Sequence, residues 1–79
     1  MPEYKGYIIF GIALRVHHTS SDRWRSQGSV YTNTQEGFIL IERLDGVILE
    51  SQRAAQDHGL ELCKKWVDEK SEHDEKARA

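Results

Sequence analysis

The chain has little cysteine and proline, and it has no long apolar run. The single cysteine among 79 residues excludes an intramolecular disulfide, and a free thiol is typical of a reducing cytoplasm. No stretch approaches the ~20 apolar residues of a membrane-spanning helix. The first residues also lack the charged and apolar pattern of a signal sequence. We therefore expect a cytoplasmic protein with no membrane partner.

The chain also lacks a strong net charge. Its formal charge is −2, and basic and acidic residues balance from residue 1 to residue 49, so the excess negative charge lies in the C-terminal part. Nucleic-acid binding usually depends on a strong positive field, which only a local patch can supply here. The composition therefore disfavours a nucleic-acid partner, although it does not exclude one.

The small size and the scattered reactive residues argue against an enzyme. A chain of 79 residues forms one domain and buries only about 60% of its unfolded surface, which leaves little room for a deep active site. The adjacent His17 and His18, with His58 and Cys63, lack the spacing of a metal site. Cys63 beside Leu62 is typical of a small core residue. We expect no enzymatic activity, no cofactor and no metal.

One amphipathic helix is predicted from Ser51 to about Lys70. Ser51 suits the N-cap, and small or apolar residues recur at helical spacing up to Trp66. Gly59 costs about 1 kcal/mol relative to alanine inside a helix. We interpret it as a point where the helix backbone lies close to a sheet; the alternative is a helix break after His58. Residues 71–79 are charged and predicted to form a frayed helix end or a disordered tail, so the domain spans residues 1–70.

Two strands are predicted before the helix. From Tyr4 to Val16 the large apolar residues occupy even positions, which predicts that the even side is buried and the odd side faces solvent. From Arg23 to Thr32, Trp24 and Val30 are expected to face the helix. Gly28 between them is expected to leave room for a large side chain such as Trp66. A hairpin turn is predicted at 33–37, with Gly37 at positive φ.

A third strand is predicted from Phe38 to Leu44, with a continuous apolar run at its start. Such a run indicates a strand that is covered on both faces or paired centrally. Asp45-Gly46 predicts a tight turn, and Val47–Leu49 is expected to form a short fourth strand or an extended lead-in to the helix. The predicted fold class is α+β, an antiparallel meander of three or four strands with one C-terminal helix packed on one face.

The predicted sheet face away from the helix is the candidate binding site. Arginine and tyrosine side chains are interleaved on it: Tyr7, Arg15, Arg23, Arg25, Gln27 and Tyr31. Such residues neutralise phosphates and stack on bases, and they are also favoured in protein interfaces. A plain solvated face remains the simplest interpretation. We expect a binding module that contacts a protein partner or forms a homodimer through this face or an edge strand; the alternative is nucleic-acid binding.

The placement of six residues resembles known small proteins. Tyr4, Gly6, Tyr7, Trp24, Ala55 and Trp66 are similar to a pattern in small bacterial proteins of uncharacterised function that combine three strands with a C-terminal helix. The chain more loosely resembles the AP2-like DNA-binding domains at the start of some phage integrases. In those domains a three-stranded sheet lies in the major groove and one helix backs it. The resemblance covers residues 4–69 and implies DNA binding by the sheet.

Overall fold

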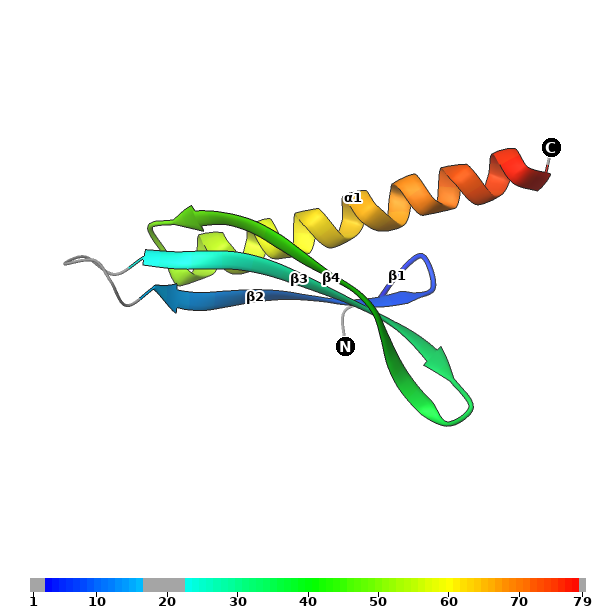
Figure 1. The fold of residues 1–79 in the computed structure, drawn as a ribbon, viewed down its shortest axis with the longest axis horizontal. Helices are drawn as coiled ribbons and strands as arrows, with labels where there is room; N and C mark the ends of the chain where they lie inside the picture. The colour runs from blue at the N-terminus through cyan, green and yellow to red at the C-terminus, as the bar shows by residue number, and fades with distance from the viewer. Residues whose placement is uncertain (1–2, 17–22, 79) are drawn as a thin grey trace.

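A four-stranded antiparallel sheet and one long helix make up the fold (Figure 1). The computed structural model describes residues 3–16 and 23–78, with side chains up to Ser71. The elements in chain order are β1 (Glu3–Tyr4), β2 (Tyr7–Val16), β3 (Arg23–Thr34), β4 (Gly37–Leu49) and α1 (Gln52–Arg78). The strands lie in the sheet in the order β1-β2-β3-β4, and α1 packs across one face. The predicted α+β class and meander are confirmed.

The fourth strand is the N-terminal β1 rather than Val47–Leu49. A two-residue turn joins β1 to β2, with Lys5 at φ 49° and Gly6 at φ 88°. Positive φ at both central residues gives the turn that matches the twist of a two-stranded ribbon. The β3–β4 hairpin has Gly37 at φ 123°, as predicted. The connection from His17 to Asp22, with its two histidines, lies outside the described residues.

The strand β4 is continuous, so two predictions about it are wrong. Asp45-Gly46 is not a tight turn. Gln27 pairs with Asp45 and Arg25 pairs with Ile48, so the register shifts there and the strand bulges. The run Phe38–Ile41 is neither central nor covered, because β4 is the last strand of the sheet and all four side chains of the run are exposed. The bulge accommodates Gly46 within β4, so the strand continues past it.

The helix α1 begins as predicted and ends later than predicted. The backbone N–H of Ala54 donates to Ser51 Oγ at 3.0 Å, which confirms Ser51 as the N-cap. The helix passes His58 without a break and ends at Arg78 rather than near Lys70. Figure 1 shows its last turns projecting past the sheet. Within the described residues, no helix combines the length and the apolar character needed to cross a membrane.

Three glycines let the backbone of α1 lie directly on the sheet. A Cβ at Gly59 would lie 2.2 Å from the carbonyl oxygen of Gln27 and 3.1 Å from the Cα of Gly11. A Cβ at Gly28 would lie 2.7 Å from the carbonyl oxygen of Gly59 and 2.6 Å from Cys63 Sγ. Gly59 is thus confirmed as the close-approach point. The space over Gly28 is filled by Gly59 and Cys63, so the expected placement of Trp66 there is wrong.

The core lies under α1 on the odd side of β2, opposite to the prediction. Ile9, Val30, Cys63 and Val67 form it, each at most 2% exposed. Ile9 pairs with Val30 and Gly11 with Gly28, and cross-strand partners share a face. The even residues of β2, including Phe10 and Leu14, therefore point away from the helix. The phase of β3 is as predicted, with Ser26, Gly28 and Val30 toward α1.

Candidate functional site

Four of the six predicted site residues share the sheet face away from α1. We call this the open sheet face. It carries the odd residues of β3, and the register places Arg23, Arg25 and Tyr31 opposite Val16, Leu14 and Ile8 of β2. Gln27 lies on the same face, where its amide donates to Asp45 Oδ1 at 3.0 Å. The predicted cluster on β3 is therefore present.

Tyr7 and Arg15 lie on the helix side of the sheet, so their assignment to the open sheet face is wrong. The ring of Tyr7 meets Trp66 edge-on, with 6.0 Å between centroids and an interplanar angle of 87°. Arg15 pairs with Trp24, a position on the helix side. Both errors have one cause, because the odd residues of β2 face α1 and the prediction placed them on the opposite face. The open sheet face consequently carries fewer polar groups than the sequence predicted.

Apolar side chains dominate the β2 part of the open sheet face. The even residues of this strand are Ile8, Phe10, Ile12, Leu14 and Val16. Phe10 meets Tyr31 edge-on at 5.6 Å between centroids. Ser29, paired with Phe10 in the ladder, is 1% exposed. Its hydroxyl has no hydrogen-bond partner among the described residues. This face is thus a small apolar cluster with an arginine-bearing strand beside it.

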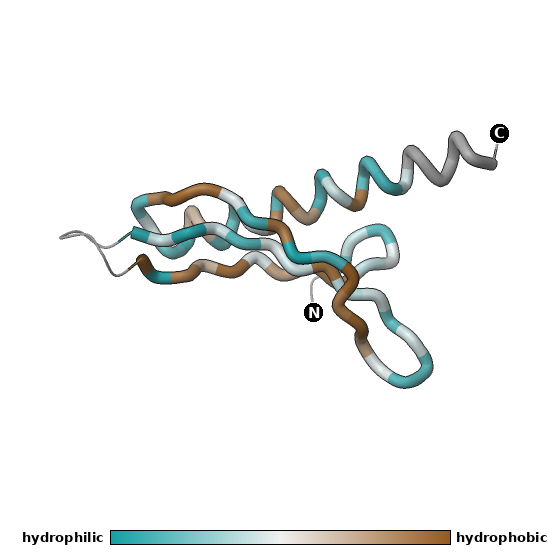
Figure 2. Tube along the Cα trace, viewed as in Figure 1, coloured by the Kyte–Doolittle hydropathy of each residue, from teal (hydrophilic) through white to brown (hydrophobic). Residues whose placement is uncertain are grey.

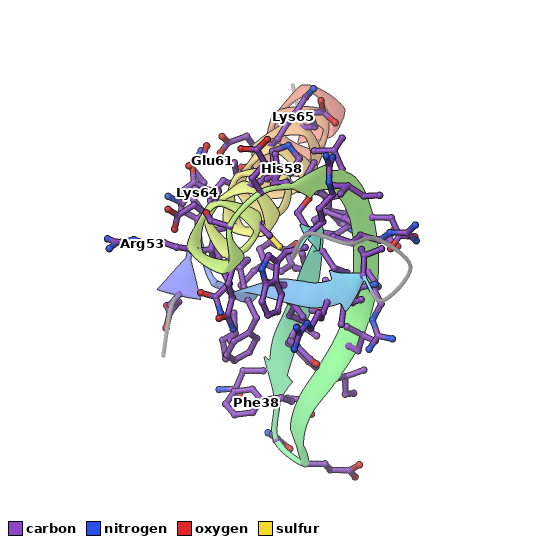
Figure 3. The ribbon with its side chains drawn as sticks, turned by 90° about the vertical axis from the view of Figure 1, so that its left-hand side faces the viewer. Phe38, Arg53, His58, Glu61, Lys64 and Lys65 are labelled. Atoms are coloured by element: carbon purple, nitrogen blue, oxygen red, sulfur yellow. The ribbon has the colours of Figure 1, made fainter. Side chains whose placement is uncertain are left out.

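The edge strand β4 carries most of the exposed apolar surface. Within the described part of the chain, eight large apolar side chains are exposed, and six of them belong to β4: Phe38, Ile39, Leu40, Ile41, Val47 and Ile48. Figure 2 shows these two apolar stretches along β4. The β3–β4 hairpin diverges from α1, and Phe38 lies near its tip, far from the helix (Figures 1 and 3). Sequence analysis did not assign this strand to the site.

Two opposite charges lie between the apolar stretches of β4. Arg43 and Asp45 pair with Ser29 and Gln27, so both lie on the open sheet face. Asp45 accepts the hydrogen bond from Gln27. Among the described residues the Arg43 guanidinium forms no ion pair. The outer edge of β4 therefore presents an apolar stretch, a positive charge, a negative charge and a second apolar stretch.

The pair Ser26 and His58 has the spacing of a nucleophile and its base, but its position excludes that role. Ser26 Oγ lies 2.8 Å from His58 Nδ1, and it accepts from the backbone N–H of Val47 at 2.9 Å. Ser26 is 0% exposed. A catalytic nucleophile must reach its substrate, and this hydroxyl is enclosed by the sheet and helix. The pair instead ties the bulge of β4 to α1.

The β1–β2 turn is fastened to α1 by Asp68. Lys5 Nζ lies 2.7 Å from Asp68 Oδ1, and the Tyr4 hydroxyl donates to the same oxygen at 2.9 Å. The Lys5 and Tyr4 hydrogen bonds hold the pKa of Asp68 below its ordinary value. The hydrogen bond to Asp68 is the main cause that raises the pKa of Tyr4. Because Tyr4 also packs against the core, this contact is structural.

Cys63 is a core residue, as predicted. It is 0% exposed, and its thiol lies 3.6 Å from the carbonyl oxygens of both Phe10 and Ser29. Burial raises its pKa, which disfavours the reactive thiolate. No group of three metal-ligating side chains occurs among the described residues.

The outer face of α1 is a charged, solvated surface. Arg53, Glu61, Lys64 and Lys65 project from it (Figure 3). Lys64 and Glu61 form an exposed ion pair of 3.7 Å, a kind of contact that contributes little to stability. Both signs of charge are present, and none of the exposed large apolar side chains of the described residues belongs to α1. This face therefore offers less binding surface than β4.

Comparisons with known proteins add no evidence on the candidate site. A scan of family models, a search of curated proteins and a search of solved structures each find no match. The resemblance to AP2-like DNA-binding domains therefore stays a prediction.

Proposed function

We propose that this protein is a non-enzymatic binding module that engages a protein partner through β4 and the adjoining open sheet face. The observation that carries the proposal is the position of six exposed apolar side chains on one edge strand. We also infer a cytoplasmic location, since the single cysteine needs no oxidising compartment.

An exposed edge strand is a ready template for another strand. Its outer N–H and C=O groups are unpaired, and proteins commonly protect such edges with charges, bulges or covering segments. Here β4 has 13 residues, and its exposed run Phe38–Ile41 contains no charge. An added strand would satisfy the backbone groups, and its side chains would cover the apolar ones. The edge therefore supports strand addition.

The size of the exposed apolar surface also favours a protein partner. The eight exposed side chains, each 37–52% accessible, are divided between two stretches of β4 and two positions of β2, and together they present on the order of 600 Å² of apolar surface. Arg23, Arg25 and Tyr31 border this surface, and arginine and tyrosine are favoured in protein interfaces. Phosphates would meet mainly aliphatic groups on β2 and β4.

A paired recovery experiment tests the proposed function. Tagged wild-type protein and an Ile39→Lys/Ile41→Lys variant are cross-linked in cell extract, and the recovered polypeptides are quantified by mass spectrometry. We expect a stoichiometric polypeptide, either this chain or another, with the wild type and a loss of at least tenfold with the variant. Lys64→Ala/Lys65→Ala on the outer face of α1 is the matched control, and it should retain the partner.

A monomer that retains no stoichiometric polypeptide would contradict the proposed function. So would tight binding of nucleic acid in its place. A mobility shift on duplex or single-stranded DNA at low salt, abolished by Arg23→Ala and Arg25→Ala and weakening steeply with salt, would identify that alternative.

A further inference from the structure

We propose that the protein partner is a second copy of this chain, paired antiparallel through β4 about a two-fold axis at Leu44. This inference rests on the proposed function and names the partner of the same edge. The pairing would join two four-stranded sheets into one continuous sheet. In such an interface each residue of one copy meets its counterpart at equal distance on the other side of the axis.

The order of residues in β4 is complementary to itself about Leu44. Between Ile39 and Leu49, residues equally distant from position 44 are apolar with apolar or positive with negative, with one exception. The opposed residues are Ile39 with Leu49, Leu40 with Ile48, Ile41 with Val47, Glu42 with Gly46 and Arg43 with Asp45. Glu42 with Gly46 is the one unlike combination, and the glycine leaves space for the carboxylate.

The opposed residues also lie on matching faces. Arg43 and Asp45 are both on the open sheet face, because they pair with Ser29 and Gln27 of β3. Leu40 and Ile48 are on that face too, opposite Tyr31 and Arg25. Side chains directly opposed across a ladder share a face and touch. The two-fold pairing therefore brings Leu40 onto Ile48 twice on the open sheet face.

The charged residues Arg43 and Asp45 favour this register of the two β4 strands over its neighbours. Arg43 of each copy meets Asp45 of the other, and two pairs form across the axis. Among the described residues this guanidinium forms no ion pair within one chain. Sliding the strands by two residues would place Arg43 opposite Arg43 or Asp45 opposite Asp45. Like charges directly opposed destabilise a ladder, so these neighbouring registers are disfavoured.

The bulges are compatible with this arrangement. The ladder with β3 shifts at Ile41, between the pairs Val30–Glu42 and Tyr31–Leu40, and again between the pairs Gln27–Asp45 and Arg25–Ile48, where Gly46 and Val47 both lie opposite Ser26. Ile41 and Val47 are equally distant from Leu44, so Ile41 of one copy opposes the second irregular segment, Gly46–Val47, of the other. The residues between them keep a regular register with β3 from Glu42 to Asp45. The hairpin end of each copy then lies along the helix-proximal end of β4 of the other.

A charge exchange tests both the partner and the register. Arg43→Asp puts aspartate opposite aspartate in a homodimer, and Asp45→Arg puts arginine opposite arginine. An equimolar mixture of the two variants restores both opposite-charge pairs. We expect a wild-type dimer by sedimentation equilibrium and at least about tenfold weaker self-association of either variant alone. The mixture should associate as tightly as the wild type, to within about threefold.

A matched control and a folding check accompany these variants. Arg53→Asp changes the same charge on the outer face of α1, away from β4 and the open sheet face, and should alter the dimer constant by less than about twofold. Far-ultraviolet circular dichroism shows whether Asp45→Arg, which loses the Gln27 hydrogen bond, still folds. Recovery of the dimer on mixing shows the same by an independent route.

Three outcomes separate this inference from the proposed function. A wild-type dimer that neither variant weakens, or that mixing does not restore, overturns the Leu44-centred pairing and leaves a protein-binding module in place. A wild type that is monomeric at millimolar concentration also overturns the pairing. Recovery of a different stoichiometric polypeptide from extract would then keep the proposed function, and recovery of none would end both.

Discussion

Position 59 shows how one missing side chain sets the distance between helix and sheet. Gly59 lies against the backbone of Gln27 and Gly11, where a Cβ has no room. The three glycines at 11, 28 and 59 therefore act as one contact. A helix backbone at this distance excludes bulky residues from the facing strand positions.

Gly59→Ala is expected to destabilise the protein. Alanine in place of glycine raises helix propensity by about 1 kcal/mol, but overpacking against a rigid backbone costs typically 1–3 kcal/mol and sometimes more. We expect the overpacking to dominate, with a net loss of about 2 kcal/mol in urea denaturation. Ala54→Gly at an exposed position is the control and should lose about 1 kcal/mol. A stabilised Gly59→Ala would mean that the close approach does not exist.

Asp68 gives the protein an acid-sensitive contact. Its pKa is below the ordinary value of 3.8 because of Lys5 and Tyr4. The unfolded chain therefore binds the proton first as pH falls, so the contribution is present above the ordinary pKa and is lost as pH falls through the folded pKa. In Asp68→Asn the loss of stability below pH ~4 should be shallower than in the wild type. Superimposable acid limbs in thermal melts would refute this role.

At the scale of elements, the prediction was correct for the phase of β3, the N-cap of α1 and the fold class. Alternation in β3 placed Trp24 and Val30 toward α1, and Ser51 capped the helix. The fold class followed from the order of these elements. Arg23, Arg25, Gln27 and Tyr31 were therefore predicted correctly as neighbours on the open sheet face.

The phase of β2 was predicted wrongly because the side of a strand with the larger apolar residues is usually the side that packs against the helix. Here the helix backbone lies so close that the facing side must be small, which Gly11 and Ala13 satisfy and Phe10 and Leu14 do not. The signal was present in Gly59 and Gly28, whose joint meaning is a close contact. Tyr7 and Arg15 were displaced from the site for that reason alone.

The edge position of β4 is a matter of strand order, which local sequence does not determine. A continuous apolar run is typical of a strand that is covered on both faces, but the run by itself does not exclude an exposed edge strand. The run from Phe38 to Ile41 was interpreted in the first way. The structure instead places it on an exposed edge strand.

The far half of α1 contributes less to the core than its aromatic residue suggested. Trp66 is half-buried, between the Tyr7 ring and the Lys70 ammonium group, which lies 4.9 Å from its centroid. We expect Trp66→Ala to cost about 2 kcal/mol, below the 3–5 kcal/mol of a fully buried aromatic residue. Chemical denaturation measures this, with Lys70→Ala as the control that removes the cation alone. A loss above about 4 kcal/mol would show a ring more enclosed than the structure has it.

At the scale of the whole molecule, the described residues cover one of the two large faces of the sheet with α1 and leave the other face open. Its extents are 52 × 29 × 17 Å, the dimensions of one sheet and one helix layer with projecting ends. A domain of this size has a small core, and here much of the apolar surface of β4 remains outside it. Association through β4 would bury apolar side chains that stay exposed in a single chain.

Hydrogen exchange on β4 is the most direct measurement of the central claim that this strand pairs with a second copy of the chain. Amide exchange is compared between the wild type at high concentration and the Arg43→Asp variant at low concentration. The outward-facing amides of residues 39–48 should exchange at least tenfold more slowly in the associated wild type, while the amides of α1 should change little. Equal exchange along β4 in both samples, or protection confined to α1, would contradict the account.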